Sequence, residues 1–243
     1  MLRAFFIYLS KARWAQNLIT RLGFARRAAR RFVAGETLDE AIAAVAALNR
    51  EGIQATLDHL GENTTSSEDA LRAGREVIEL IEAINRSGVQ ANVSIKLSQL
   101  GLTLNYDLCR DLYIKILESA RKSGNFVRVD MEDSSLTQKT MEMVLGAARS
   151  GFTNTGIVIQ AYLRRSREDI RVLAANQIPV RLCKGAYKEP ANLAYESMEE
   201  VNRSYDALAE SLLAVGKRWK NRPDDPRWPA FAAYATHDDK RIA

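Results

Sequence analysis

The sequence predicts a (βα)8 TIM-type barrel, an α/β fold in which parallel strands alternate with helices. First, six short runs rich in Val and Ile alternate with amphipathic helical stretches along the chain. Second, the glycine fingerprints GxGxxG and GxxxxGK[ST], which doubly wound nucleotide-binding sheets usually carry, are both absent. A closed barrel of this class needs more strands than six, so we expect an incomplete barrel.

The elements follow a regular order. A helix at 38–49 is introduced by Thr37 and Glu40, which are spaced as a capping box. The predicted strands span 53–60, 92–97, 126–131, 156–163, 178–187 and 231–236. The later helices span 67–86, 106–122, 136–149, 167–176 and 193–219. Ser67 is the predicted N-cap of the second helix, and Gly88, Gly124 and Gly151 are predicted to end three helices.

The composition is that of an ordinary globular protein. The chain has 243 residues, of which 47% are hydrophobic and 27% charged. Its net charge of +5 suits an anionic ligand or an anionic membrane surface, but it is too mild to indicate nucleic acid. The two cysteines, Cys109 and Cys183, form no CxxC or Cys/His cluster. We therefore expect no metal site, no disulfide framework and a cytoplasmic location.

Residues 1–34 are unusually basic, with eight Lys or Arg and no acid. Apolar residues recur there at roughly helical spacing. We expect an N-terminal helical segment at 1–50 and the barrel at 51–243. Two interpretations of 1–34 stay open. It packs on the barrel with its basic residues in water, or it lies on anionic lipid at the inner face of the plasma membrane. A purely non-enzymatic membrane-binding domain is the corresponding functional alternative.

Polar residues follow every predicted strand. In chain order they are Asp58, His59 and Glu62; Lys96 and Ser98; Asp130, Met131, Glu132 and Asp133; Gln160 and Tyr162; Arg181, Lys184 and Tyr187; and Thr236, His237 and Asp238. Any one of them is more often a solvated side chain or a helix cap. The carboxyl ends of barrel strands meet at one face, so six polar endings together predict a single site.

The residue types at these ends indicate the chemistry. Lys96, Asp130 and Arg181 stand in apolar runs, where a charge needs a partner or a ligand. Several cations around one or two acids suit a ligand with phosphate or carboxylate groups. The small pair Gly185-Ala186 lets a flat ligand approach the backbone. No hydrolase triad or metal triad is present, so the residues predict either an organic cofactor or an aldolase-type lysine Schiff base on Lys96 or Lys184.

Five segments, VSIKLSQLGL, VRVDMED, VIQAYLRR, RLCKGAY and ATHD, resemble in order and spacing the FAD-dependent proline dehydrogenases. RRFVAGETLDEAI and TLDHLGEN resemble the monofunctional bacterial branch. The resemblance covers nearly the whole chain and implies a distorted (βα)8 barrel. It also implies oxidation of L-proline to Δ1-pyrroline-5-carboxylate, with hydride transfer to FAD and electrons passed to a membrane quinone. Pyrroline-5-carboxylate dehydrogenase would be a partner.

The resemblance implies roles for matching residues. Asp130 and Arg181 would form the catalytic centre, Asp130 organising the charges around the substrate and Arg181 lying beside flavin N5. Lys96 would pair with the proline carboxylate, and Tyr187 would pack on the substrate ring. The other implied cofactor contacts are Met131, Gln160, Lys184, Gly185, Ala186, Thr236 and His237.

The family pattern continues beyond the last predicted strand of this sequence. The resemblance implies two more strands and a final helix with a YxxRRxxE-type motif, whose arginine pair binds the proline carboxylate. The sequence ends at Ala243 without them. Without this charge-assisted clamp, we expect the chain by itself to bind proline and FAD weakly. A flavin-loaded chain that oxidises proline at the rate usual for the family would contradict this expectation.

Overall fold

The computed structural model describes residues 35, 37–59, 64–217, 219, 225 and 227–242. The basic segment 1–34, on which the predicted membrane contact rests, lies outside these residues, as does Glu62. No helix within the described ranges is both long and apolar enough to cross a bilayer.

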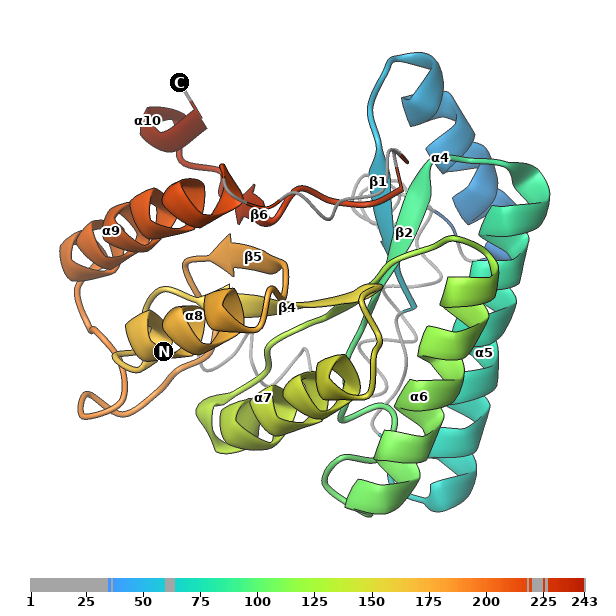
Figure 1. Cartoon of the computed structure of the whole chain (residues 1–243), viewed down its shortest axis with the longest axis horizontal. Coiled ribbons are helices and arrows are strands. Elements are labelled where there is room, and N and C mark those ends of the chain that lie inside the picture. Colours follow the sequence, from blue (N-terminus) through green and yellow to red (C-terminus); the bar gives the residue numbers. More distant parts are fainter. Residues whose placement is uncertain are drawn as a thin grey trace, which may run out of the picture.

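Six parallel strands form one sheet in chain order, β1-β2-β3-β4-β5-β6. They are β1 Ala55–Asp58, β2 Ala91–Ile95, β3 Val127–Val129, β4 Thr155–Gln160, β5 Val180–Cys183 and β6 Ala232–Ala235. Figure 1 shows the strands curling through the middle of the molecule, with the helices around their outer side. Each strand lies beside its predecessor after a helical crossover, which is the connection of a βα barrel. The described part of the chain is thus a half-barrel, and the predicted fold class is confirmed.

The helices lie close to their predicted positions. They are α4 Leu38–Arg50, α5 Ser67–Ser87, α6 Tyr106–Lys122, α7 Ser134–Arg149, α8 Ser166–Ala175, α9 Met198–Gly216 and α10 Asp239–Ile242. Gly88, Gly124 and Gly151 have positive φ angles of 68°, 63° and 87° at the ends of α5, α6 and α7, as predicted.

One predicted N-cap and one predicted helix start were wrong. The N-cap of α5 is Ser66 rather than Ser67, because Ser66 and Asp69 exchange hydrogen bonds in a capping box. Helix α9 begins at Met198 rather than at 193, because Ser197 and Glu200 form a second capping box. Before it, the Ala194 amide donates to Pro190 O at 3.0 Å in a turn. In both cases a capping box sets the boundary.

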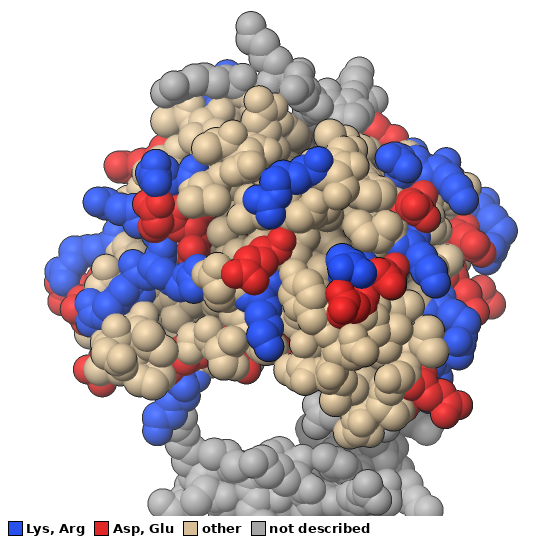
Figure 2. All heavy atoms as spheres, turned by 60° about the horizontal axis from the view of Figure 1, so that its bottom comes forward, with Lys and Arg blue, Asp and Glu red and all other residues tan. Residues whose placement is uncertain are grey.

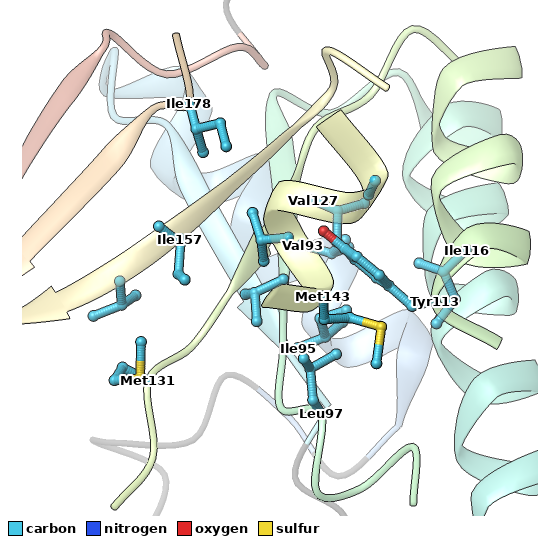
Figure 3. Packing of buried hydrophobic residues seen from close by; sticks show 14 of the residues in the cluster. Val93, Ile95, Leu97, Tyr113, Ile116, Val127, Met131, Met143, Ile157 and Ile178 are labelled. Carbon is cyan, nitrogen blue, oxygen red and sulfur yellow. The ribbon is translucent and has the colours of Figure 1, made fainter. Parts of the chain in front are cut away.

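The outer face of the sheet packs against the helices. Side chains alternate between the two faces of a strand. Val93 and Ile95 of β2, Val127 of β3 and Ile157 of β4 point outward into the buried cluster. Figure 3 shows Val93 and Val127 on the side of Tyr113 of α6 and Met143 of α7. Burial of one such aliphatic side chain contributes about 1.5–3 kcal/mol, so this layer is the main source of stability.

Aromatic side chains cover the inner face of the half-barrel at the amino ends of the strands. Trp228 packs on Phe126 with ring centroids 5.6 Å apart. Its indole Nε1 donates to Gly124 O at 3.0 Å, which ties the segment before β6 to the turn after α6. The guanidinium of Arg128 lies 5.0 Å from the Phe126 ring centroid, so a cation forms the next layer above the aromatic pair.

Gly156 on β4 makes this layer possible. A Cβ at Gly156 would lie 2.5 Å from Pro179 O, 2.8 Å from Phe126 and 2.9 Å from Arg128 Nη1. Two of these neighbours are backbone and a buried ring, which have little room to move. Arg128 in turn donates to Pro179 O at 3.1 Å through the space that the missing side chain leaves.

The charged surface is mixed rather than basic where the structure describes it. Figure 2 shows Lys or Arg interspersed with Asp or Glu over one face. Many pairs are one helical turn apart, such as Arg72 with Asp69, Arg171 with Glu168 and Arg203 with Glu199. Such exposed pairs contribute little to stability, because water screens them.

Gly156→Ala should lower the free energy of unfolding by about 2–4 kcal/mol because overpacking forces the inner layer apart. Urea unfolding followed by circular dichroism measures this change. Gly146 of α7 is the matched control, because a Cβ there meets nothing within 4 Å. Gly146→Ala should leave stability unchanged or raise it by up to about 1 kcal/mol through helix propensity. Equal effects of the two substitutions would contradict the packing argument.

Candidate active site

One cavity of about 680 Å³ lies at the carboxyl ends of the strands. Ten of the residues predicted for the site line it: Lys96, Asp130, Met131, Gln160, Lys184, Gly185, Ala186, Tyr187, Thr236 and His237. They come from β2 through β6 and the loops that follow these strands. The parallel order of the strands therefore brings segments that are far apart in sequence to one place, as predicted. The role of each residue stays a prediction.

Asp130 is the centre of the charged groups in this cavity. Ser94 Oγ donates to its Oδ1 at 2.6 Å. Lys96 Nζ lies 3.5 Å from its Oδ2, and Arg181 Nη1 lies 3.7 Å from its Oδ1. Arg181, which does not line the cavity itself, thus joins the site through Asp130. One carboxylate connects β2, β3 and β5.

Lys96 is held as a cation between two carboxylates. Its Nζ lies 2.5 Å from Asp58 Oδ2, in addition to the contact with Asp130. Burial lowers the pKa of Lys96, but the hydrogen bond and the charge of Asp58, together with Asp130, outweigh it, so the pKa is raised. Burial in turn raises the pKa of Asp58. The like charge of Asp130 adds to this rise, whereas the hydrogen bond and the charge of Lys96 oppose it. Two acids therefore share one lysine, which carries its proton at neutral pH.

The end of β5 presents backbone to the cavity. Gly185 has a φ of 115°, and a Cβ there would lie 2.2 Å from the Tyr162 ring. Only glycine allows the chain to pass so closely over the tyrosine. Next to it, Lys184 Nζ lies 2.7 Å from Asp238 Oδ2, and Arg241 bonds the same carboxylate at 2.5 Å. The hydrogen bond from Lys184 lowers the pKa of Asp238 to about 2, so this clasp stays charged in mild acid.

Gln160 is buried and oriented by the protein. Its Nε2 donates to Glu132 O at 2.7 Å. The Glu132 carboxylate is itself fixed by the backbone amide of Ser98 at 3.1 Å. Since the amide nitrogen of Gln160 is engaged, its oxygen is the group left to accept a hydrogen bond from a ligand. With the small Gly185-Ala186 backbone and the cation Lys184, the cavity suits a flat ligand that carries anionic groups.

Several contributing residues were not among the predicted site residues. Asp58 and Asp238 had been noticed only as polar strand ends, and Cys183 only as a cysteine of the strand; each lines the cavity or pairs with a residue that does. Ser94 was missed altogether. The signal was available, because Ser94 precedes Lys96 by two residues and must lie on the same face of β2.

A second cavity, of about 420 Å³, lies between α8 and α9. Arg164, Arg167 and Arg203 line it, and the guanidinium of Arg164 stacks 4.6 Å from the Tyr195 ring centroid. None of the predicted site residues lines it. The cavity at the strand ends is therefore the candidate active site.

Comparison with known proteins identifies the family of this chain. The sequence profile of the family described as "Proline dehydrogenase" matches residues 41–243. "Proline dehydrogenase 1" of Bacillus subtilis is 36% identical over 247 residues, which cover 100% of this chain and 76% of that protein. This chain belongs to the proline dehydrogenase family. "Proline dehydrogenase" of Deinococcus radiodurans is also 36% identical, over 88% of this chain and 66% of that protein.

The solved structure of a larger protein contains a region with the same fold. Proline utilization A (PutA) from Bdellovibrio bacteriovorus, inactivated by N-propargylglycine, superimposes with a TM-score of 0.76 at 25% identity. The match covers 88% of this chain. This chain spans only 26% of the length of that protein.

The two thiols should be unreactive near neutral pH. Burial raises the pKa of Cys183 to about 11 and that of Cys109 to about 12. Because the thiolate is the nucleophile, iodoacetamide at pH 8 should label Cys183 roughly a hundredfold more slowly than a free cysteine, and the rate should rise up to about pH 11. Peptide mass spectrometry measures both sites, and the urea-unfolded chain is the control. Rapid labelling of the folded chain at pH 8 would contradict this environment.

Proposed function

We propose that this chain is a proline dehydrogenase that oxidises L-proline to Δ1-pyrroline-5-carboxylate with FAD as the hydride acceptor. The observation that carries the proposal is the cluster around Asp130 in a cavity of sufficient size, with Lys96 and Arg181 as its cationic partners. Membership of the family supports the reaction.

The residues that line the cavity fit FAD. Gly185 lines the cavity with its backbone alone, since a Cβ at this position would collide with the Tyr162 ring. Gln160 offers an acceptor for the edge of a heterocycle, as an isoalloxazine presents. Lys184 would hold the anionic part of the cofactor, and Met131, Ala186, Thr236 and His237 would complete its contacts. FAD, when bound, would supply the two-electron acceptor that no amino-acid side chain provides.

The other groups would bind and orient the substrate. The ammonium of Lys96 would pair with the proline carboxylate, and Tyr187, which is 42% exposed, would cover the ring. Oxidation removes a hydride from the ring carbon beside the nitrogen and a proton from the nitrogen, which leaves a C=N bond. Asp130 would hold the ammonium of Lys96 and the guanidinium of Arg181 in position during this step. Arg181 would stabilise the negative charge that develops on the acceptor.

The aldolase-type alternative is not favoured by the structure. A lysine that forms a Schiff base must lose its proton, and such lysines have lowered pKa values. The pKa of Lys96 is instead raised by Asp58 and Asp130. Lys184 is paired with Asp238 at 2.7 Å. Lys96 is therefore held as an ammonium group, and Lys184 is engaged in an ion pair.

The wider setting is part of the proposal. A membrane quinone would receive the electrons, and pyrroline-5-carboxylate dehydrogenase would consume the product. Relatives named "Bifunctional protein PutA" support this link, at 27% identity over 18% of their length. A peripheral location at the inner face of the membrane, through residues 1–34, would bring the protein to its quinone.

Proline-dependent bleaching of the flavin tests this function. With FAD in excess under anaerobic conditions, L-proline should lower the flavin absorbance at about 450 nm, where oxidised flavins absorb. Lys96→Met should weaken proline binding by about ten- to a hundredfold, since it removes one partner of a charge-assisted pair. Asp130→Asn should slow reduction at least about tenfold because both cations lose their anchor.

Arg203→Gln is the matched control, since Arg203 pairs with Glu199 on α9 and lines the second cavity rather than the candidate active site. It should leave bleaching unchanged. Bleaching that survives both Lys96→Met and Asp130→Asn would overturn the assignment. Borohydride trapping of a carbonyl substrate on Lys96 or Lys184 would favour the aldolase-type reaction instead.

A further inference from the structure

Arg128 is a buried cation without a contacting carboxylate among the described residues. Its side chain belongs to the inner face of β3, two residues before Asp130, and is only 1% exposed. Its hydrogen bonds go to neutral acceptors, Pro179 O at 3.1 Å and Ile157 O at 3.5 Å. Its Nε has no hydrogen-bond partner in the described part of the chain.

Such a group is costly to the fold. A buried charge loses its hydration, and two carbonyl contacts do not replace an ion pair. Burial, with the nearby charge of Arg181, lowers the pKa of Arg128 to about 9, although Asp130 acts in the opposite direction. The side chain therefore still carries its proton at neutral pH. An apolar side chain of similar length would fill this place at lower cost.

The neighbouring acids are already engaged. Asp58 bonds Lys96, Asp130 accepts from Ser94 and faces Arg181, and Glu132 accepts from Ser98. Gly156 leaves the space that Arg128 occupies, because a Cβ there would collide with Arg128 and with Pro179 O. Two positions therefore maintain the buried positive charge: Arg128 on β3 carries it, and Gly156 on β4 leaves room for it.

We propose that Arg128 is an electrostatic positioning residue, whose buried charge makes the cavity at the strand ends select ligands with a carboxylate. It acts through the interior rather than by contact, since Lys96 and Asp130 line the cavity and Arg128 does not. The charge is effective because the protein interior screens it less than water does. The ligand class, a cyclic carboxylate, rests on the proposed function.

Two matched probes isolate the charge of the ligand. Cyclopentanecarboxylate and cyclopentanecarboxamide have the same ring, but only the first is an anion. Binding to the full chain with FAD present is measured by titration calorimetry. Arg128→Met should weaken carboxylate binding by about tenfold, which is the order of magnitude of one unit-charge interaction in a protein interior. Binding of the amide should not change, and the melting temperature should stay equal or rise.

Further variants keep the test decisive if Arg128→Met does not fold. Arg128→Lys retains the charge and should restore carboxylate binding to within about twofold. Arg128→Gln removes the charge with a polar side chain and should weaken carboxylate binding as Met does. Arg121→Met is the control for net charge, because Arg121 stacks on Phe152 on the helix side of the sheet, 4.8 Å from the ring centroid. It should change neither affinity.

The outcomes separate this inference from the proposed function. Equal weakening of carboxylate and amide, or no weakening of either, would overturn the role of Arg128, whether or not proline is oxidised. A selective loss of carboxylate binding in a chain that oxidises no proline would support Arg128 and reject the reaction.

Discussion

The interaction on which the site depends is the set of bonds to the Asp130 carboxylate. Ser94, Lys96 and Arg181 reach it from β2 and β5, on either side of the strand that carries it. A hydrogen bond to a charged partner contributes about 1.5–3 kcal/mol, and an unpaired buried charge costs more. These side chains therefore hold one another in place. If the register of β2 or β5 slipped by one residue, the charges would face the helices instead.

The two faces of the sheet have different tasks. The outer face carries Val and Ile against α6 and α7, and it supplies the stability. The inner faces of most barrels are filled by bulky branched side chains. Here the inner face holds Thr56, Asn92, Ser94 and Arg128 beneath the cavity, with Thr56 bonding both Asn92 and Arg181. The protein thus gives up apolar packing on one face in return for oriented polar groups, which is the arrangement that a charged ligand requires.

Much of the fold was predictable because each signal was local. Tyr106–Lys122 was predicted at its observed bounds, because its apolar period and the helix-ending Gly124 agree with each other; the structure adds the Asn105 side chain as its N-cap. The N-cap of α5 was misplaced by one residue because Ser66 and Ser67 are both possible caps, and the start of α9 was predicted too early because the capping box at Ser197 was overlooked. The strands were predicted too long, because an apolar run continues beyond the end of the regular strand, as at Ala161 and Tyr162, whose amides still donate to Cys183 O and Lys184 O.

By itself, the sequence determined the βα order, the cavity at the strand ends and the residue types that line it. Strand periodicity and the convergence of parallel strand ends are enough for these conclusions. Only the tertiary structure decided the partners. It placed Asp58 on Lys96, gave Asp130 two cations and left Arg128 with carbonyl oxygens alone. These contacts join residues dozens of positions apart, and the curvature of the sheet selects among several equally plausible pairs of acid and base. The physical reason is that charge pairing depends on distance in space, which no local pattern specifies.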